Sequence, residues 1–418
     1  MERTIVIVDP LSTGQELAPA FADRGVRAVA VMTRLDTPPS QLSGWHPENF
    51  EHILVWNGTE AGREALAEQL RRLDPLAVLA GSEFGVLLAE HLAARVTPDL
   101  ANDPALITAR RDKWDMGQAV AAAGIPTLRQ FRAQSVEQAA EWIEGSELGA
   151  SKLVLKPTQS CATDSVHFVA PGGDWRTPFE AILGHTNITN AVNTAVLVQE
   201  FAEGVEYIVD LYAVDGEFGL VDVCRYTKAT RYDNADHGRT GIYERVDFLP
   251  PDSPEIPELF AFAQRVAKAV GIRNFSAHVE IMVTPAGPRL VEIGARPAGG
   301  GHQMVTRLAT GDAQIERTVR HLLDGEFKPG YDWVQHVRAA FLTAQRSGTW
   351  RNGDLFDQVD GLPTFYGKHI PYRTGDLVPA STGLFDSFGW VVFADPDLDA
   401  IDADFAKLKE LEAQIILD

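Results

Sequence analysis

The chain has 418 residues, of which 45% are hydrophobic and 23% are charged, and its formal net charge is −21 at pH 7. This composition is ordinary for a globular protein and excludes disordered, collagen-like and low-complexity chains, and the acidic excess disfavours nucleic acid as a partner because it repels phosphate backbones. The two cysteines are too few for a disulfide framework, and no apolar run approaches the roughly 20 residues of a membrane helix, so we expect a cytoplasmic protein that does not bind membranes.

The first third of the chain alternates short apolar strands with helical segments. We expect strands at residues 4–8, 26–32, 53–56 and 76–80, and helices at residues 14–24, 61–73, 84–95 and 106–123. Strands that alternate with helices of about 10–15 residues indicate βαβ units and a parallel sheet. No Gly-x-Gly-x-x-Gly follows the first strand, so the pattern leaves open whether this region is a scaffold or a dinucleotide site.

The rest of the chain has longer strands with hairpin turns between them. We expect strands at residues 152–156, 196–201, 206–214, 219–226, 275–284, 289–293 and 389–393, and helices at residues 179–183, 257–270 and 402–413. A single core rarely grows past about 250–300 residues. We therefore predict three parts: an N-terminal parallel βα domain over 1–125, a central α+β domain over 126–330, and a mixed α/β lobe over 331–418.

Two glutamates stand in apolar strands on either side of one turn. Glu280 follows Val279, and Glu292 lies between Val291 and Ile293. Adjacent antiparallel strands would place both carboxylates at the same end of a sheet, where they repel each other unless a cation neutralises them. Oxygen ligands suit Mg²⁺, which takes further ligands from nucleotide phosphates. Two strand glutamates that face solvent are the alternative.

Several neighbouring segments are suited to a nucleotide. Glu292 runs into the glycine-rich stretch 294–302, whose N–H groups can approach an anion closely. Lys156 ends an apolar strand, where a buried ammonium needs an anionic partner, and the small polar residues 158–165 can fold over phosphates as a flap. The bend within residues 198–207 can read an adenine edge. A surface loop and a lysine that reaches solvent are the plainer interpretations.

The order of these segments resembles a known superfamily. The runs VLKP, VQEFAEGVEY, HVEI and LVEIGARPAGG stand in the order and at the spacing of the ATP-grasp enzymes, and EIGARPAGG and SCATDSV are most similar to the L-amino acid ligases, which join two amino acids into a dipeptide. The resemblance implies an ATP-grasp fold for the central domain, with ATP and Mg²⁺, or Mn²⁺, as cofactors. It also implies a homodimer, since dimers are common among such proteins.

The resemblance assigns most of the ATP contacts. Lys113 and Lys156 match two lysines that contact ATP phosphates, and Glu206 matches the ribose ligand. The phosphate flap and the hinge that recognises adenine would be formed by Ser160, Thr163, Ser165, Glu200, Phe201 and Ala202.

The resemblance also assigns the metal, catalytic and substrate residues. Glu280 and Glu292 would hold Mg²⁺, and Arg296 would be the catalytic residue that stabilises the acyl phosphate and the tetrahedral intermediate. Glu244 and Asp247 would line the substrate amine. Beside these assignments, backbone N–H groups near Gly299 and Gly300 would stabilise the oxyanion, and His278 is either a satisfied histidine of the sheet or a phosphate or substrate contact. Two positions depart from the pattern: Asp247 stands where the dipeptide ligases have His, and Gly294 stands where many ATP-grasp enzymes have a metal-binding Asn.

These observations predict an ATP-dependent carboxylate–amine ligase. It would form an amide or peptide bond between amino acids or similar small molecules through an acyl phosphate, and release ADP and phosphate. Two alternatives stay open: a ligase or carboxylase of the same fold that uses bicarbonate or a purine precursor, and a nucleotide-binding protein that has lost catalysis. Specificity is expected in the loop over residues 227–243, where Lys228, Arg231 and Arg239 could meet anionic groups.

Overall fold

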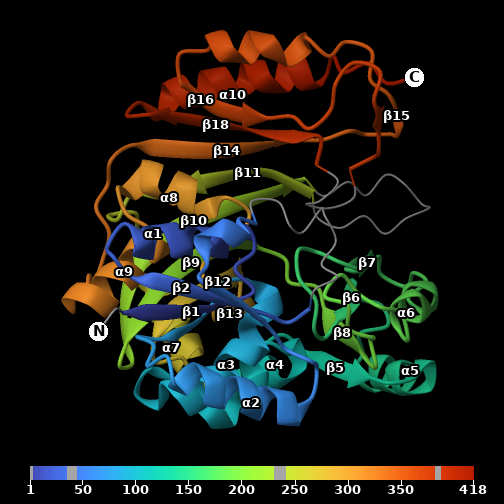
Figure 1. Ribbon diagram of the computed structural model, residues 1–418. Coiled ribbons are helices and arrows are strands. Elements are labelled where there is room, and N and C mark those ends of the chain that lie inside the picture. Colours follow the sequence, from blue (N-terminus) through green and yellow to red (C-terminus); the bar gives the residue numbers. More distant parts are fainter. Residues whose placement is uncertain (1–2, 35–44, 230–241, 382–386) are drawn as a thin grey trace.

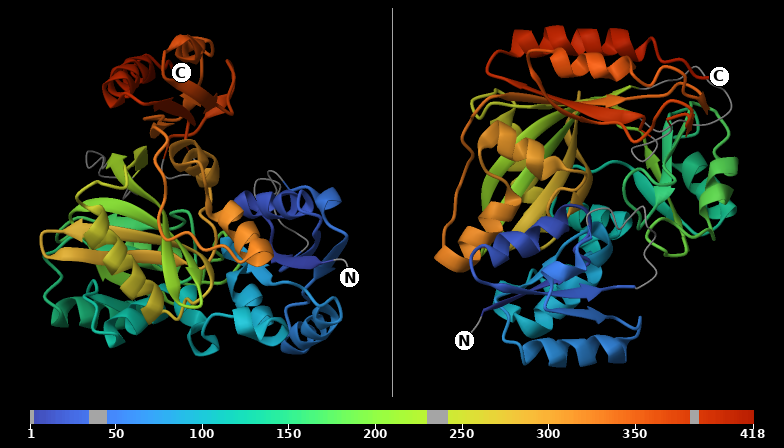
Figure 2. Two further views of the ribbon diagram at one scale, coloured as in Figure 1. Left: turned by 90° about the vertical axis from the view of Figure 1, so that its left-hand side faces the viewer. Right: turned by 45° about the horizontal axis from the view of Figure 1, so that its top comes forward.

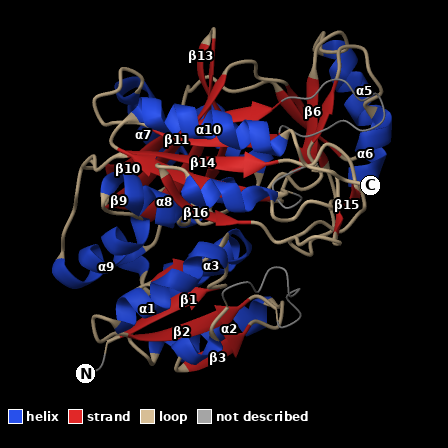
Figure 3. Ribbon diagram, turned by 90° about the horizontal axis from the view of Figure 1, so that it is seen from above, coloured by secondary structure: helices blue, strands red, loops and turns tan. Residues whose placement is uncertain are grey.

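The computed structural model describes residues 3–34, 45–229, 242–381 and 387–418 (Figure 1). The N-terminal region forms a parallel four-stranded sheet in the order β3-β2-β1-β4. Its strands and helices are β1 (Thr4–Val8), α1 (Leu17–Ala22), β2 (Arg27–Met32), β3 (His52–Val55), α2 (Glu60–Arg71), β4 (Val78–Ala80) and α3 (Val86–Val96). Figure 3 shows β1, β2 and β3 side by side with these helices around them. The predicted parallel βα arrangement is confirmed.

Strand β1 is buried along its whole length because helices cover both of its faces. Val6 and Val8 pack with residues of α2 and α3, whereas Ile5 and Ile7 pack with α1 and with α9 (Gln314–Asp324). A strand that is covered on both faces carries an uninterrupted apolar run, as this one does. Helix α9, which lies some 300 residues later in the chain, thus completes the N-terminal core.

The predicted helix over residues 106–123 begins later in the structure. Short 3-10 turns at Pro104–Leu106 and Thr108–Arg110 precede α4, which spans Lys113–Ala122. Asp112 has an extended backbone and its side chain accepts hydrogen bonds from the N–H groups of Trp114 and Asp115, which satisfies the free donors of the first turn. This cap sets the helix start and places Lys113 in the first turn.

A second, antiparallel sheet follows, in the order β5-β8-β6-β7. Its elements are β5 (Gln130–Ala133), α5 (Val136–Gly145), β6 (Leu153–Pro157), β7 (His167–Val169), α6 (Arg176–Ile182) and β8 (Val196–Glu200). Phe179 of α6 and Ile143 of α5 pack against the strands in one core. This sheet and its two helices form a lobe beside the larger sheet (Figure 1).

The largest sheet has eight antiparallel strands in the order β13-β12-β9-β10-β11-β14-β18-β16. The strands are β9 (Val205–Val214), β10 (Glu217–Ala229), β11 (Ile242–Phe248), β12 (Phe275–Thr284), β13 (Gly287–Gly294), β14 (His336–Leu342), β16 (Phe365–His369) and β18 (Gly389–Asp395). Because β14 pairs with β11, the sheet continues across position 330, where the sequence predicts a domain boundary. The three-part division of the chain stays a prediction.

Helices cover this sheet on both faces. Helix α7 (Ile256–Ala269) packs against one face through the odd-numbered residues of β9, such as Val209 and Leu211. Helix α8 (His302–Thr310) packs near Ile208 on the other face. Helix α10 (Leu398–Glu412) covers β14 and β18, and β15 (Gly348–Thr349) pairs with β17 (Leu377–Val378) nearby.

The two ends of the chain lie at opposite ends of the molecule, with the C-terminal segment (red) far from the N-terminal sheet (Figure 2). Among the described residues, no helix combines the length and the apolar character that a membrane span requires.

Candidate functional site

A cavity of about 420 Å³ lies between the β5–β8 lobe and the large sheet. Strands β6 and β8 contribute its lobe side, and β9, β10, β12 and β13 contribute its sheet side. Of the residues singled out in the sequence, it is lined by Lys113, Lys156, Ser160, Thr163, Glu200, Phe201, Ala202, Glu206, Glu280 and Glu292. The structure therefore brings together the residues assigned to nucleotide and metal from six separate segments.

The two glutamates face each other across neighbouring strands. Glu280 on β12 and Glu292 on β13 are direct partners in the antiparallel register, so both side chains lie on one face of the sheet. Burial, together with the nearby charge of Glu292, raises the pKa of the Glu280 carboxyl. Two partly buried carboxylates side by side fit a divalent cation, because its charge removes their repulsion and all the donors are oxygen.

Two lysines lie on the opposite wall of the cavity. The Nζ atom of Lys113 lies 3.0 Å from Oε1 of Glu292 and donates to the backbone oxygen of Ser160 at 2.8 Å. Lys156 is buried at the end of β6, where burial and the charge of Lys113 lower its pKa to about 8. An anion such as a phosphate placed between the two ammonium groups would favour their charged forms.

The flap after β6 is built on an unusual backbone. Ala162, Thr163 and Ser165 have φ values of 55°, 62° and 54°, a region that side chains other than glycine rarely adopt. Asp164 holds this conformation, because its carboxylate accepts hydrogen bonds from Ser160 Oγ at 2.6 Å and from Ser165 Oγ at 3.2 Å. Ser165 thus points its hydroxyl at Asp164, whereas Thr163 lines the cavity.

The end of β8 forms an aromatic and apolar wall. Phe201 packs edge-on against Phe168 with ring centres 5.5 Å apart, and Lys152 Nζ lies 3.4 Å from the Phe201 ring centre. The carboxylate of Glu200 accepts hydrogen bonds from the N–H and the Nε of Arg129, at 2.9 and 2.6 Å. Leu128 and Val154 also line the cavity, and Met282 of β12 and Val291 of β13 add apolar surface from the sheet side. Such a slot suits a flat purine ring.

A buried ion pair lies at the far side of the same cavity. Lys228 Nζ of β10 lies 2.6 Å from Oε2 of Glu206 on β9. Burial opposes the charge of Lys228, but Glu206 raises its pKa, so the lysine stays protonated. The sequence placed Lys228 in a specificity loop, whereas the structure places it in the nucleotide cavity; Arg231 and Arg239 lie outside the described residues.

The guanidinium of Arg296 is held by a residue of the N-terminal region. Arg296 Nε lies 2.8 Å from Oε2 of Glu83, whose other oxygen lies 3.4 Å from Arg111 Nε. A Cβ atom added at Gly294 would lie 3.2 Å from Glu83 Oε2 and 3.4 Å from Arg296 Cζ. Glycine at position 294, in place of the Asn of the resemblance, therefore leaves room for the ion pair of Glu83 and Arg296. Glu83 was missed because only the fold brings the 3-10 turn after β4, Glu83–Gly85, next to the loop after β13.

The remaining substrate candidates lie outside the cavity lining. Gly300 donates its N–H to Ser12 Oγ at 3.3 Å, which places the glycine-rich loop, including Gly299, against the loop after β1. His278 Nδ1 lies 2.7 Å from Asp210 Oδ1, and its Nε2 lies 3.8 Å from Glu280 Oε1. His278 therefore contacts Asp210 and lies beside Glu280, one of the two paired glutamates.

Glu244 and Asp247 lie on β11 and face the C-terminal elements. Asp247 lies within ion-pair distance of three guanidiniums, at 2.5 Å from Arg338, 3.1 Å from Arg245 and 3.7 Å from Arg225. Glu244 pairs with Lys409 of α10 at 3.6 Å. A carboxylate that is already surrounded by three cations is poorly placed to bind a substrate ammonium.

The sequence matches one domain family and aligns with a named relative over almost its whole length. Residues 150–306 match the ATP-grasp domain family. Dapdiamide A synthase from Enterobacter agglomerans is 28% identical over 425 residues, which cover 99% of this chain and 96% of that protein. The similarity to this relative thus extends over both chains almost completely.

Solved structures are similar in fold. The L-amino acid ligase from Bacillus licheniformis superimposes with a TM-score of 0.71 at 16% identity, covering 100% of this chain and 99% of the other. The biotin carboxylase domain of Hydrogenobacter thermophilus 2-oxoglutarate carboxylase, solved with MgADP and bicarbonate, has a TM-score of 0.62 at 11% identity and covers 100% and 90%. The predicted ATP-grasp fold is confirmed.

Proposed function

Because the chain belongs to the ATP-grasp superfamily, we propose that it is an ATP-dependent carboxylate–amine ligase that forms an amide bond and releases ADP and phosphate. The observation that carries this proposal is the arrangement of one cavity, in which the paired Glu280 and Glu292 face Lys113 and Lys156. The almost complete alignment with an amide-forming synthase supports an amine as the acceptor.

In this proposal ATP binds in the cavity. Its adenine would lie against Phe168 and Met282 next to the backbone of residues 200–202, and its ribose would lie near Glu206. Lys113, Lys156 and the flap would contact the phosphates. Glu280 and Glu292 would hold Mg²⁺, or Mn²⁺ in its place, which when bound neutralises charge on the phosphates during transfer.

The chemistry needs no covalent nucleophile on the enzyme. A substrate carboxylate oxygen attacks the γ-phosphorus of ATP, the bond to the bridging oxygen breaks, and ADP leaves. The substrate amine then attacks the carbonyl carbon of the acyl phosphate, and phosphate leaves from the tetrahedral intermediate. Arg296, held in place by Glu83, would stabilise the oxyanion, since a preorganised guanidinium in a buried site acts strongly on developing charge.

The substrates are proposed to be amino acids or amino-acid-like molecules, by analogy with the similar amide-forming synthase and L-amino acid ligase. The carboxylase alternative rests on the fold that the chain shares with a biotin carboxylase domain. A silent nucleotide-binding protein is disfavoured, because such a protein has no need for an oriented arginine beside the metal pair.

A screen of amino acid pairs for phosphate release tests the proposal. ADP and phosphate should form only when a carboxylate and an amine are both present, and mass spectrometry should detect the amide. Formation of AMP and pyrophosphate would exclude the acyl-phosphate route. Turnover with bicarbonate alone would favour the carboxylase, and ATP binding without any turnover across broad panels would favour the silent protein.

A further inference from the structure

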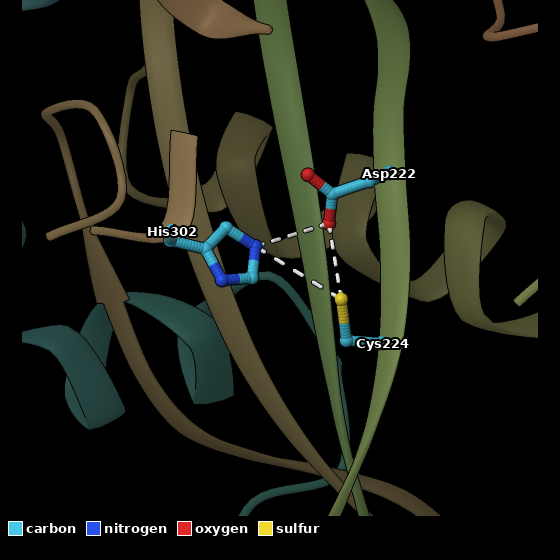
Figure 4. Close-up of side chains that lie close together, drawn as sticks. All are labelled: Asp222, Cys224 and His302. Carbon is cyan, nitrogen blue, oxygen red and sulfur yellow. Dashed lines mark hydrogen bonds and ion pairs between the residues drawn. The ribbon is translucent and has the colours of Figure 1, made fainter. Parts of the chain in front are cut away.

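A cluster of buried polar side chains lies beneath the glycine-rich loop, on the sheet face that α8 covers. Asp222 and Cys224 are neighbours on one face of β10, and His302 is the first residue of α8. Figure 4 shows the imidazole ring turned toward the carboxylate and the sulfur. His302 Nε2 lies 3.3 Å from Asp222 Oδ1 and 3.9 Å from Cys224 Sγ, and these two atoms lie 3.5 Å apart.

A fourth buried residue, a carboxylate, lies beside His302. Asp210 on β9 is fully buried, and its Oδ2 atom has no hydrogen-bond partner among the described residues. This oxygen lies 3.5 Å from His302 Nε2. A buried carboxylate oxygen without a hydrogen bond is unfavourable and requires an explanation.

We propose that Asp222, Cys224 and His302 form a binding site for a structural Zn²⁺ ion, with Asp210, which lies beside His302, as the fourth ligand. Bonds of the usual length to a tetrahedral zinc place neighbouring ligand atoms about 3.3–3.6 Å apart, close to the separations of 3.3, 3.5 and 3.9 Å within the cluster. One sulfur, one nitrogen and two oxygens suit Zn²⁺ better than Mg²⁺ or Ca²⁺. With Asp210 as the fourth ligand no position would stay open, which is the arrangement of a structural site.

The surrounding contacts orient the ligands as in other metal sites. Thr306 Oγ1 donates to Asp222 Oδ2 at 2.9 Å, and His278 Nδ1 lies 2.7 Å from Asp210 Oδ1. Each carboxylate thus has one oxygen fixed by an outer partner and the other turned toward the cluster. Hydrogen-bond partners of this kind hold metal-binding side chains in position.

A metal-free interpretation of the same cluster exists and is testable. Burial opposes protonation of His302, but Asp222 raises its pKa, so a proton on Nε2 can balance the carboxylates in place of an ion. Binding of Zn²⁺ would replace that proton and the thiol proton of Cys224, and both protons would pass to the buffer. The two interpretations differ in metal content and in the protonation of sulfur.

The proposed ion goes beyond the ligase activity, because it is separate from the Mg²⁺ pair. It would tie the start of α8 to β9 and β10. The loop before α8 contains Gly300 and Gly301, with φ values of 65° and 79°. An ion at His302 would therefore fix the end of the glycine-rich loop.

The test uses the full chain, produced with added zinc and purified without a metal-chelating resin. Elemental analysis should find about one zinc ion per chain. After exchange to Co²⁺, the protein should show the near-ultraviolet thiolate-to-cobalt band and the intense visible bands of tetrahedral cobalt. Cys224→Ser should lower the zinc content at least about tenfold and abolish the thiolate band. Cys161→Ser is the matched control and should keep both signals, since Cys161 is the other cysteine of the chain.

Several outcomes would overturn the proposal. Wild-type protein with less than about a tenth of an equivalent of zinc and no thiolate–cobalt band would leave the cluster a protonated ion pair. A band that persists in Cys224→Ser, or that is lost in Cys161→Ser, would place the metal elsewhere. If Cys224→Ser fails to fold, the proposal is tested instead by the cobalt spectrum of the wild type and by the zinc content of the variant Asp210→Asn. None of these signals depends on turnover.

Discussion

At the scale of single residues, Lys156 has a strongly perturbed charge at the candidate site. Its pKa of about 8 lies below the ordinary value of 10.5, so the folded protein binds fewer protons than the unfolded chain between these pH values. The destabilisation of the folded state by this buried charge is fully present below pH 8 and decreases as the pH rises toward 10.5.

We therefore expect Lys156→Met to be more stable than the wild type at pH 7, by about 1–3 kcal/mol in the absence of nucleotide. The difference should shrink by about 1 kcal/mol at pH 9, since the wild-type lysine is then partly neutral. Chemical denaturation at both pH values measures this. The same variant should lose ADP affinity. A difference in stability between Lys156→Met and the wild type that grows with pH would contradict the lowered pKa of Lys156.

Glu292 is expected to be essential for turnover. Glu292→Gln removes one carboxylate of the proposed metal pair and its contact with Lys113, so ADP release should fall at least about 100-fold. Higher Mg²⁺ concentrations should restore part of the rate. Glu258→Gln, an exposed change on α7, is the control and should leave the rate unchanged. A normal rate in Glu292→Gln would remove the basis of the site.

Glu83 is expected to act by positioning Arg296. Arg296 lowers the pKa of the Glu83 carboxyl in spite of its burial, so Glu83 is charged and fixes the guanidinium. Glu83→Gln should lower kcat about tenfold or more while the Kd for ADP changes little. Single-turnover kinetics and calorimetry separate the two effects. Equal losses in kcat and in ADP affinity would indicate general damage to the fold instead.

At the scale of elements, the start of α4 links a helix cap to the site. Asp112→Ala removes the cap that precedes Lys113 and should reduce the free energy of unfolding by about 1 kcal/mol. Asp112→Asn should retain most of that stability, because Asn also accepts hydrogen bonds at this position. Denaturant titrations compare the two variants, and equal losses in both would mean that the charge, rather than the cap, is required.

The alternation of side chains along β10 accounts for two groups of polar residues. Asp222, Cys224, Tyr226 and Lys228 share one face of the strand. Tyr226 and Lys228 line the nucleotide cavity, whereas Asp222 and Cys224 lie under α8. One strand thus serves both the nucleotide cavity and the proposed zinc site, which makes its register against β9 decisive for each.

At the scale of the whole molecule, the eight-stranded sheet joins the central and C-terminal regions. Asp247 on β11 binds Arg338 on β14, and Arg338 also pairs with Asp402 of α10 at 2.7 Å. The C-terminal elements are therefore tied to the same sheet as the nucleotide cavity, and we expect them to unfold together.

We expect Asp247→Asn to destabilise the protein by about 3–5 kcal/mol, because it removes the buried anion that pairs with the buried guanidinium of Arg338. The KM for the amine should change little, since Asp247 lies outside the cavity lining. Thermal unfolding and steady-state kinetics measure the two quantities. A large rise in KM with unchanged stability would instead support the substrate role that the resemblance implies for Asp247.

The local sequence was enough to predict the elements and much of the nucleotide cavity. Apolar runs ended by Gly, Pro or Asp locate β1, β6, β12 and β13 closely. The same runs carry Lys156, Glu280 and Glu292 at fixed positions, so their side of the strand follows from period-two alternation. The start of α4 was missed because a single cap, Asp112, decided it.

Contacts between distant segments were decided only by the tertiary structure. Glu83 meets Arg296 across 213 positions, and Asp210, Asp222 and His302 converge from two strands and a helix. Alternation along a strand fixes which face a residue occupies, but pairing between strands and the packing of helices fix which faces meet. The sequence by itself therefore determined the ATP-grasp fold and singled out residues that line one cavity. Burial in the assembled fold decided the ion pairs, the shifted pKa values and the proposed zinc site, because these arise from charges that folding brings together and removes from water.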